Sequence, residues 1–126
     1  MPIARELDPS NRILRTTIFG EVTFEDLQAH VESVCALRGE AYAELVDARG
    51  VSAVAVTVRE LSRLAELGRQ KLAARGMPPR AVIVTGLVHF GMARVFAAMV
   101  RPWMRLGVFD DPAAAEEWLD MLMRIA

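Results

Sequence analysis

The side chains of this chain that could act as nucleophiles, bases or metal ligands are few and widely separated. The sequence holds two histidines, His30 and His89, and one cysteine, Cys35. No HxH, HExxH or CxxC pattern is present, and no GxSxG turn that would expose a nucleophilic serine. We therefore expect no metal, no cofactor and no catalytic residue. An enzyme is the least favoured class, because no nucleophile, base and orienting partner occur together.

Cys35, His30 and Asp47 are better explained by structural roles than by catalysis or metal binding. Cys35 and His30 lie on or beside the apolar stripe of a predicted helix, which favours a buried thiol and a partly exposed, neutral histidine. Asp47 ends an apolar strand, where an unpaired carboxylate is costly. We expect it to pair with Arg49, Arg80 or nearby backbone N–H groups.

Thr57 carries the hydroxyl with the clearest setting. Thr57 and Glu60 have the spacing of a capping box, in which the hydroxyl accepts a backbone N–H and the carboxylate accepts another. Such a cap stabilises a helix start by roughly 1 kcal/mol. Alternatively, Thr57 is a phosphoacceptor, since a phosphate there would lie at the positive end of the helix dipole. We favour the cap and keep the phosphoacceptor role as the alternative.

Composition predicts one small folded domain, residues 1–126. Hydrophobic residues make up 53% of the 126 residues and charged residues 25%, and the net charge of -1 gives no general attraction to nucleic acid. The early charges at Arg5 and Glu6 do not fit a signal peptide. The most apolar stretch, 81–100, is interrupted by His89 and Arg94, so we expect no membrane span. A single cysteine suits a cytoplasmic protein.

The chain is organised around the stretch from Glu44 to Glu60. This part of the sequence predicts a buried strand over 42–48, a loop, and a helix from Thr57. The helix is marked by an apolar stripe with polar residues off it: Leu61, Leu64, Ala65, Gly68 and Leu72. Ligands of α/β proteins bind at the carboxyl ends of strands, so we expect any site near this helix start.

The remaining segments follow from turn residues and periodicity. The predicted elements are strands at 3–7 and 13–19, closed by Gly20, then a helix from Thr23 to near Gly39, a strand at 81–85, a turn at 86–89, a helix at 90–100, a strand at 105–109 and a helix after Pro112. Strands that alternate with helices predict a parallel sheet. The fold is therefore expected to be α/β, with about five mostly parallel strands, an N-terminal antiparallel hairpin and four helices.

Four segments, in this order, resemble the STAS or SpoIIAA-like domains of bacterial anti-sigma-factor antagonists. They are Gly20-Glu-Val-Thr-Phe-Glu-Asp-Leu27, Leu45-Val-Asp-Ala-Arg-Gly-Val51, Phe90-Gly-Met-Ala-Arg94, and Val108-Phe-Asp-Asp with Trp118-Leu119. More narrowly, the chain resembles the SpoIIAA-like subgroup described as STAS/SEC14. The resemblance implies a SpoIIAA-like fold and a regulatory role through a protein partner.

In the antagonists, a hydroxyl within an Asp-Ser-Ser/Thr-Gly motif is phosphorylated by a partner kinase. The matching stretch here is Ala55-Val-Thr-Val58, in which only Thr57 keeps a hydroxyl. Because the aspartate, the preceding serine and the glycine are absent, the phosphorylation switch is not expected to carry over.

The predicted helix at 90–100 is apolar on nearly every side, and a helix of this kind should be buried on every side. A domain of this size cannot cover it with one sheet face, so a second copy, a partner or an apolar ligand must cover the rest. The candidate surface comprises Met92, Val95, Phe96, Met99 and Trp103. Our leading hypothesis is a non-enzymatic interaction domain that forms a homodimer. The alternative is a module that binds a small apolar ligand such as a lipid, in a cavity lined by Met92, Phe96 and Met99.

Overall fold

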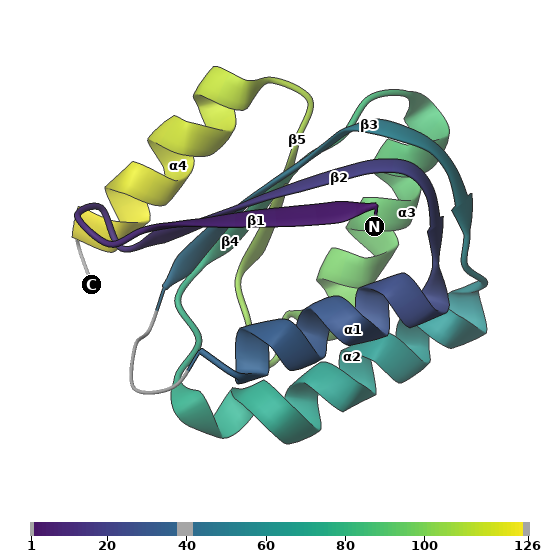
Figure 1. Cartoon of the computed structure of the whole chain (residues 1–126), viewed down its shortest axis with the longest axis horizontal. Helices are drawn as coiled ribbons and strands as arrows, with labels where there is room; N and C mark the ends of the chain where they lie inside the picture. The colour runs from purple at the N-terminus through teal and green to yellow at the C-terminus, as the bar shows by residue number, and fades with distance from the viewer. Residues whose placement is uncertain (1, 38–41, 125–126) are drawn as a thin grey trace.

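Five strands form one mixed sheet in the order β1-β2-β3-β4-β5 in the computed structural model, which describes residues 2–37 and 42–124 (Figure 1). β1 (Ile3–Asp8) pairs antiparallel with β2 (Ile13–Thr23). β3 (Ala43–Ala55), β4 (Arg80–Ile83) and β5 (Leu106–Phe109) are then added in parallel. The predicted hairpin and the predominantly parallel sheet are confirmed.

The four helices divide between the two faces of the sheet. α1 (Phe24–Cys35), α2 (Val58–Leu72) and α3 (Leu87–Val100) lie on one face, and α4 (Pro112–Arg124) lies on the other, as Figure 1 shows. A single 3-10 turn, 73–75, follows α2 within the described residues. Among the described residues, no helix is long and apolar enough to cross a membrane.

Alternation along the central strands supplies both sides of the core. Val46 and Ala48 of β3 pack in a cluster with Val84, on the face that α1 to α3 cover. Leu45 and Ile83 point the opposite way and pack against α4. Successive side chains of a strand point to opposite faces, so a strand apolar at every position is covered on both sides. The predicted interior strand at 81–85 is confirmed as a strand covered on both faces, but it runs over Arg80–Ile83 and ends two residues earlier than predicted.

Local capping chemistry sets two of the helix starts. Thr23 and Asp26 form a capping box at α1, and Thr57 and Glu60 form one at α2. At α4, the backbone N–H of Ala113 donates to a carboxylate oxygen of Asp111. The predicted stripe of α2 is buried in full: Leu61, Leu64, Ala65, Gly68 and Leu72.

The predicted ends of two strands were wrong. β2 runs past Gly20 to Thr23, and β3 runs past Gly50 to Ala55, because the two extensions pair with each other. Gly20 does not close the strand; it has a φ of 74°, at an irregularity in the register. Glycine adopts this conformation without a steric penalty, so the strand can bulge and continue. The segment expected to be a loop is therefore strand.

The predicted start of the third helix was also wrong. α3 begins at Leu87 instead of Phe90, so His89 lies within its first turn and not in a preceding turn. Its N-cap is Gly86, with a φ of 90° and no side-chain cap. No serine, threonine or aspartate marked this start in the sequence. α1 ends at Cys35, and Gly39, where the sequence predicted its end, lies outside the described residues.

Candidate ligand-binding cavity

A cavity of about 230 Å³ lies between the sheet and the layer formed by α1, α2 and α3. Its wall is almost entirely apolar. The sheet and the residue that follows β4 contribute Ile18, Val22, Val46, Ala48, Val82 and Val84, and the helices contribute Leu27, Val31, Leu61, Leu64, Met92 and Phe96. Since protein interiors are normally packed as densely as organic crystals, an apolar space of this size is an unusual feature of a small domain.

The part of α3 that lines the cavity explains why this helix is apolar on so many sides. Met92, Ala93 and Phe96 face the cavity and are only partly buried, whereas Val100 at the end of the helix is fully buried. At the other end, Leu87 and Val88 are 92% and 74% exposed. One flank of α3 thus lines the cavity, while the first turn of the helix exposes apolar side chains to solvent.

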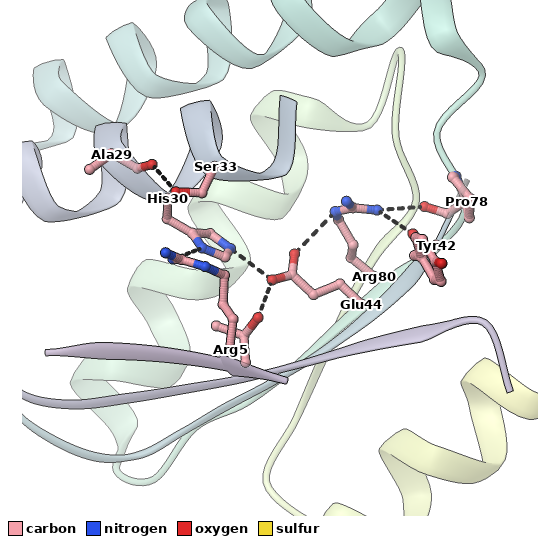
Figure 2. Close-up of polar contacts among 9 residues, drawn as sticks. Arg5, Ala29, His30, Ser33, Tyr42, Glu44, Pro78 and Arg80 are labelled. Carbon is pink, nitrogen blue, oxygen red and sulfur yellow. Dashed lines mark hydrogen bonds and ion pairs between the residues drawn. The ribbon is translucent and has the colours of Figure 1, made fainter. Parts of the chain in front are cut away.

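Buried polar residues complete the wall at one end of the cavity. Glu44, His30 and Arg80 all line it, and Figure 2 shows their side chains pointing toward one another. The Glu44 carboxylate is the centre of the group: Oε2 lies 2.7 Å from His30 Nε2 and accepts a 2.6 Å hydrogen bond from the Thr16 hydroxyl, while Oε1 lies 3.2 Å from Arg80 Nε. The side chains of Glu44, Arg80 and His30 are 4%, 8% and 12% exposed. We call these four residues the Glu44 cluster.

Arg5 defines the proton arrangement on His30. Arg5 Nη1 lies 3.2 Å from His30 Nδ1, and a guanidinium can only donate, so Nδ1 accepts. In this arrangement Nε2 carries the proton and donates it to Glu44. Figure 2 shows the Arg5 side chain reaching the imidazole from β1, on the side away from Arg80.

The cluster keeps Glu44 ionised despite its burial. Burial alone would raise its pKa, but the hydrogen bond with His30, the charge of Arg80 and the Thr16 hydroxyl outweigh that effect and lower the pKa to about 2. Burial lowers the pKa of Arg80, and the charge of Glu44 partly offsets this. Arg80 also donates to the carbonyl oxygens of Tyr42 and Pro78, at 3.3 and 3.2 Å.

Sheet register brings Glu44 and Arg80 together. They are directly opposed partners on β3 and β4. Glu44 has the same orientation as Val46 and Ala48, so a charged residue occupies an interior position of an apolar alternation. This charged residue in an apolar alternation was the available sequence signal, and it was not among the predicted site residues. His30 joins from α1. It is partly exposed, as predicted, but the sequence did not indicate its contact with Glu44.

The Glu44 cluster also lies at the opposite ends of the parallel strands from the carboxyl ends, where the sequence predicted a site. Glu44 is the second residue of β3 and Arg80 the first of β4, so the group sits at the amino ends of the parallel strands. Of the polar wall residues, only His89 lies beyond the carboxyl end of a strand, in the first turn of α3. Asp47 pairs with Arg49, as predicted, through a 2.8 Å ion pair.

The residues proposed for a partner or ligand surface fall into two groups. Met92, Phe96 and Trp103 line the cavity. Val95 and Met99 do not: Val95 is 43% exposed, and Met99 packs against a cluster of Ala65, Val100 and Met104. Their role in binding stays a prediction. No group of three or more potential metal ligands occurs among the described residues.

A solved structure with a similar fold is that of an uncharacterized protein from Shewanella loihica PV-4, of the DUF3478 family with a SpoIIAA-like fold. The two chains are 19% identical and superpose with a TM-score of 0.58 over 93% of each chain. This chain has a SpoIIAA-like fold. The fold implied by the resemblance is confirmed. Sequence comparisons with protein-family models and with curated proteins give no significant match.

In the SpoIIAA-like fold of this chain, Thr57 serves as the cap predicted for it. Its Oγ1 accepts from the backbone N–H of Glu60 at 3.1 Å, and the Glu60 carboxylate accepts from the backbone N–H of Thr57 at 2.9 Å. Thr57 is exposed. Because a shared fold does not carry an activity with it, functional inference must rest on the cavity and its wall.

Proposed function

We propose that this chain is a non-enzymatic module that binds one small apolar molecule in the cavity between the sheet and α1 to α3. The observation that carries the proposal is the apolar wall around about 230 Å³ of space. An empty space of this kind costs stability, because the lining side chains lose dispersion contacts and gain nothing in return. A bound apolar molecule restores those contacts.

The volume limits the size of the ligand. An engineered protein cavity of about 150 Å³ lined by apolar side chains stays dry and binds benzene. By that scale, the space here suits a molecule of roughly nine or ten non-hydrogen atoms. Flexible thioether side chains such as that of Met92, which lines the cavity, adapt to ligands of varied shape.

Native mass spectrometry of gently purified protein tests the proposal. We expect a small apolar adduct on the wild-type chain and its loss in Ala93→Leu, because the added carbons enter the cavity. Ala98→Leu is the matched control, since Ala98 lies on the same helix but is exposed. A wild-type chain with no adduct, and with no response of Trp103 fluorescence to added octan-1-ol, would contradict the proposal.

A second candidate function, homodimer formation or binding of a regulatory protein partner, has its own observation. Leu87, Val88 and Val58 are 92%, 74% and 64% exposed, at the starts of α3 and α2. Large apolar side chains exposed in this way favour an interaction surface. Sedimentation at micromolar concentration tests self-association: Leu87→Ser with Val88→Ser should dissociate a dimer, and a wild-type chain that sediments as a monomer would remove the dimer from consideration.

A further inference from the structure

We propose that the ligand of the cavity is an uncharged alcohol, whose hydroxyl binds at the Glu44 cluster while its hydrocarbon part fills the apolar space, and that the same cluster excludes carboxylates. This inference rests on the proposed function and narrows it from apolar molecules in general to one chemical class. It starts from the presence of Glu44, His30 and Arg80 in the wall of an otherwise apolar cavity.

The hydrogen-bonding capacity of Glu44 fits a hydroxyl donor. A carboxylate offers about four acceptor positions. Among the described residues, Oε2 accepts hydrogen bonds from Thr16 and His30, whereas Oε1 is in contact only with Arg80, as an ion pair. A ligand hydroxyl can donate to the remaining position on Oε1. Hydrogen bonds to an ionised acceptor are stronger than those between neutral groups, so this contact orients the ligand.

The charges around the same position disfavour an anion. Glu44 is ionised, and its negative charge neutralises Arg80 at 3.2 Å. Arg5, the other cation of the group, contacts the far side of His30 and is exposed, so water screens it. A ligand carboxylate at this end would therefore meet the carboxylate of Glu44 without an unpaired buried cation to offset the repulsion. Like charges a few ångströms apart in a partly buried site weaken binding by about tenfold or more.

The chain provides its own reporter for this preference. Trp103 lines the cavity, whereas Trp118 packs against Phe109 on the α4 face, with ring centroids 5.5 Å apart. These are the two tryptophans of the sequence. In a Trp118→Phe background, the fluorescence of Trp103 reports ligand entry.

The experiment is a titration of this reporter at neutral pH with octan-1-ol, octanoate and propylbenzene. We expect octan-1-ol to bind at least about tenfold more tightly than octanoate. Octanoate binding as tightly as octan-1-ol overturns the inference. Propylbenzene binding as tightly as octan-1-ol also overturns it, while leaving the proposed apolar site in place. If none of the three binds, the proposed function fails and the inference fails with it.

A variant attributes the preference to Glu44. In Glu44→Gln the negative charge is lost and Arg80 is left unpaired, so the preference for octan-1-ol over octanoate should disappear or reverse. Glu66→Gln is the matched control, because Glu66 is an exposed carboxylate paired with Arg69 on α2, and the preference should persist there. An unchanged preference in folded Glu44→Gln overturns the role of Glu44. If this variant does not fold, the comparison of ligands on the reporter chain still decides the inference.

Discussion

Glu44 and Arg80 face each other on adjacent parallel strands, and their buried side chains form an ion pair with 3.2 Å between Oε1 and Nε. Neither charge is left without a partner, since His30 and Thr16 bind the other oxygen of Glu44 and two backbone carbonyls accept from Arg80. Buried charges persist in proteins when their hydrogen bonds are satisfied in this way. The cluster thus gives an apolar cavity one strongly polar end.

Acid should destabilise the protein through Glu44. Its folded pKa of about 2 lies below the ordinary value of 4.5, so the unfolded chain takes up the proton first as pH falls. The stabilisation is fully present above about pH 4.5 and is lost progressively towards pH 2, with a total on the order of 3 kcal/mol. Urea unfolding at several pH values should show this dependence, and Glu44→Gln should flatten it. A wild-type slope in Glu44→Gln would contradict this account.

Arg80→Met should lower the free energy of unfolding by about 3–5 kcal/mol, because it leaves the Glu44 carboxylate buried without its cation. The control is Arg69→Met, which breaks an exposed ion pair with Glu66 and should cost less than about 1 kcal/mol. Removing both charges, in Glu44→Gln with Arg80→Met, should recover part of the loss. Equilibrium denaturation measures all three, and similar losses for Arg80→Met and Arg69→Met would refute the prediction.

Two glycine variants should have opposite effects. A Cβ at Gly68 would lie 2.8 Å from the end of the Trp103 ring, whereas a Cβ at Gly91 would meet nothing within 4 Å. Alanine is favoured over glycine in a helix by about 0.5–1 kcal/mol, so Gly91→Ala should be stabilising by about that amount. Gly68→Ala should be destabilising and should shift Trp103 emission, because the indole must move. Equal stability of the two variants would argue against the close contact.

Thr57→Ala should cost roughly 1 kcal/mol, since it removes the hydroxyl that caps α2. Thr57→Ser keeps the hydroxyl and should stay close to the wild-type stability. Thr85 provides the control: it is exposed after β4, and Thr85→Ala should change stability by less than about 0.5 kcal/mol. Thermal unfolding compares the three, and a Thr57→Ala variant as stable as the wild type would show that the cap is not needed.

Short-range chemistry made much of the fold predictable from the sequence. The Thr57–Glu60 box and the stripe of α2 depend only on residues within a few turns of each other, and both were predicted correctly. The same holds for the order of strands and helices. The extensions of β2 and β3 were not predicted, because glycines such as Gly20 and Gly50 are typical of strand ends. Only the pairing of the two extensions with each other shows that the strands continue.

The candidate site depended on contacts between distant parts of the chain. Thr16, His30, Glu44 and Arg80 come from three strands and one helix, and the sequence gives each of them a separate, ordinary role. The apolar character of α3 predicted that a partner or a ligand covers it. The space beside the helix depends on how three helices pack on the sheet. Periodicity determines which face of an element is apolar, whereas the space left between packed elements depends on their positions in three dimensions. The sequence therefore determined the apolar faces of this protein. The tertiary structure decided that the faces of α1, α2, α3 and the sheet line one cavity, with Glu44, His30 and Arg80 in its wall.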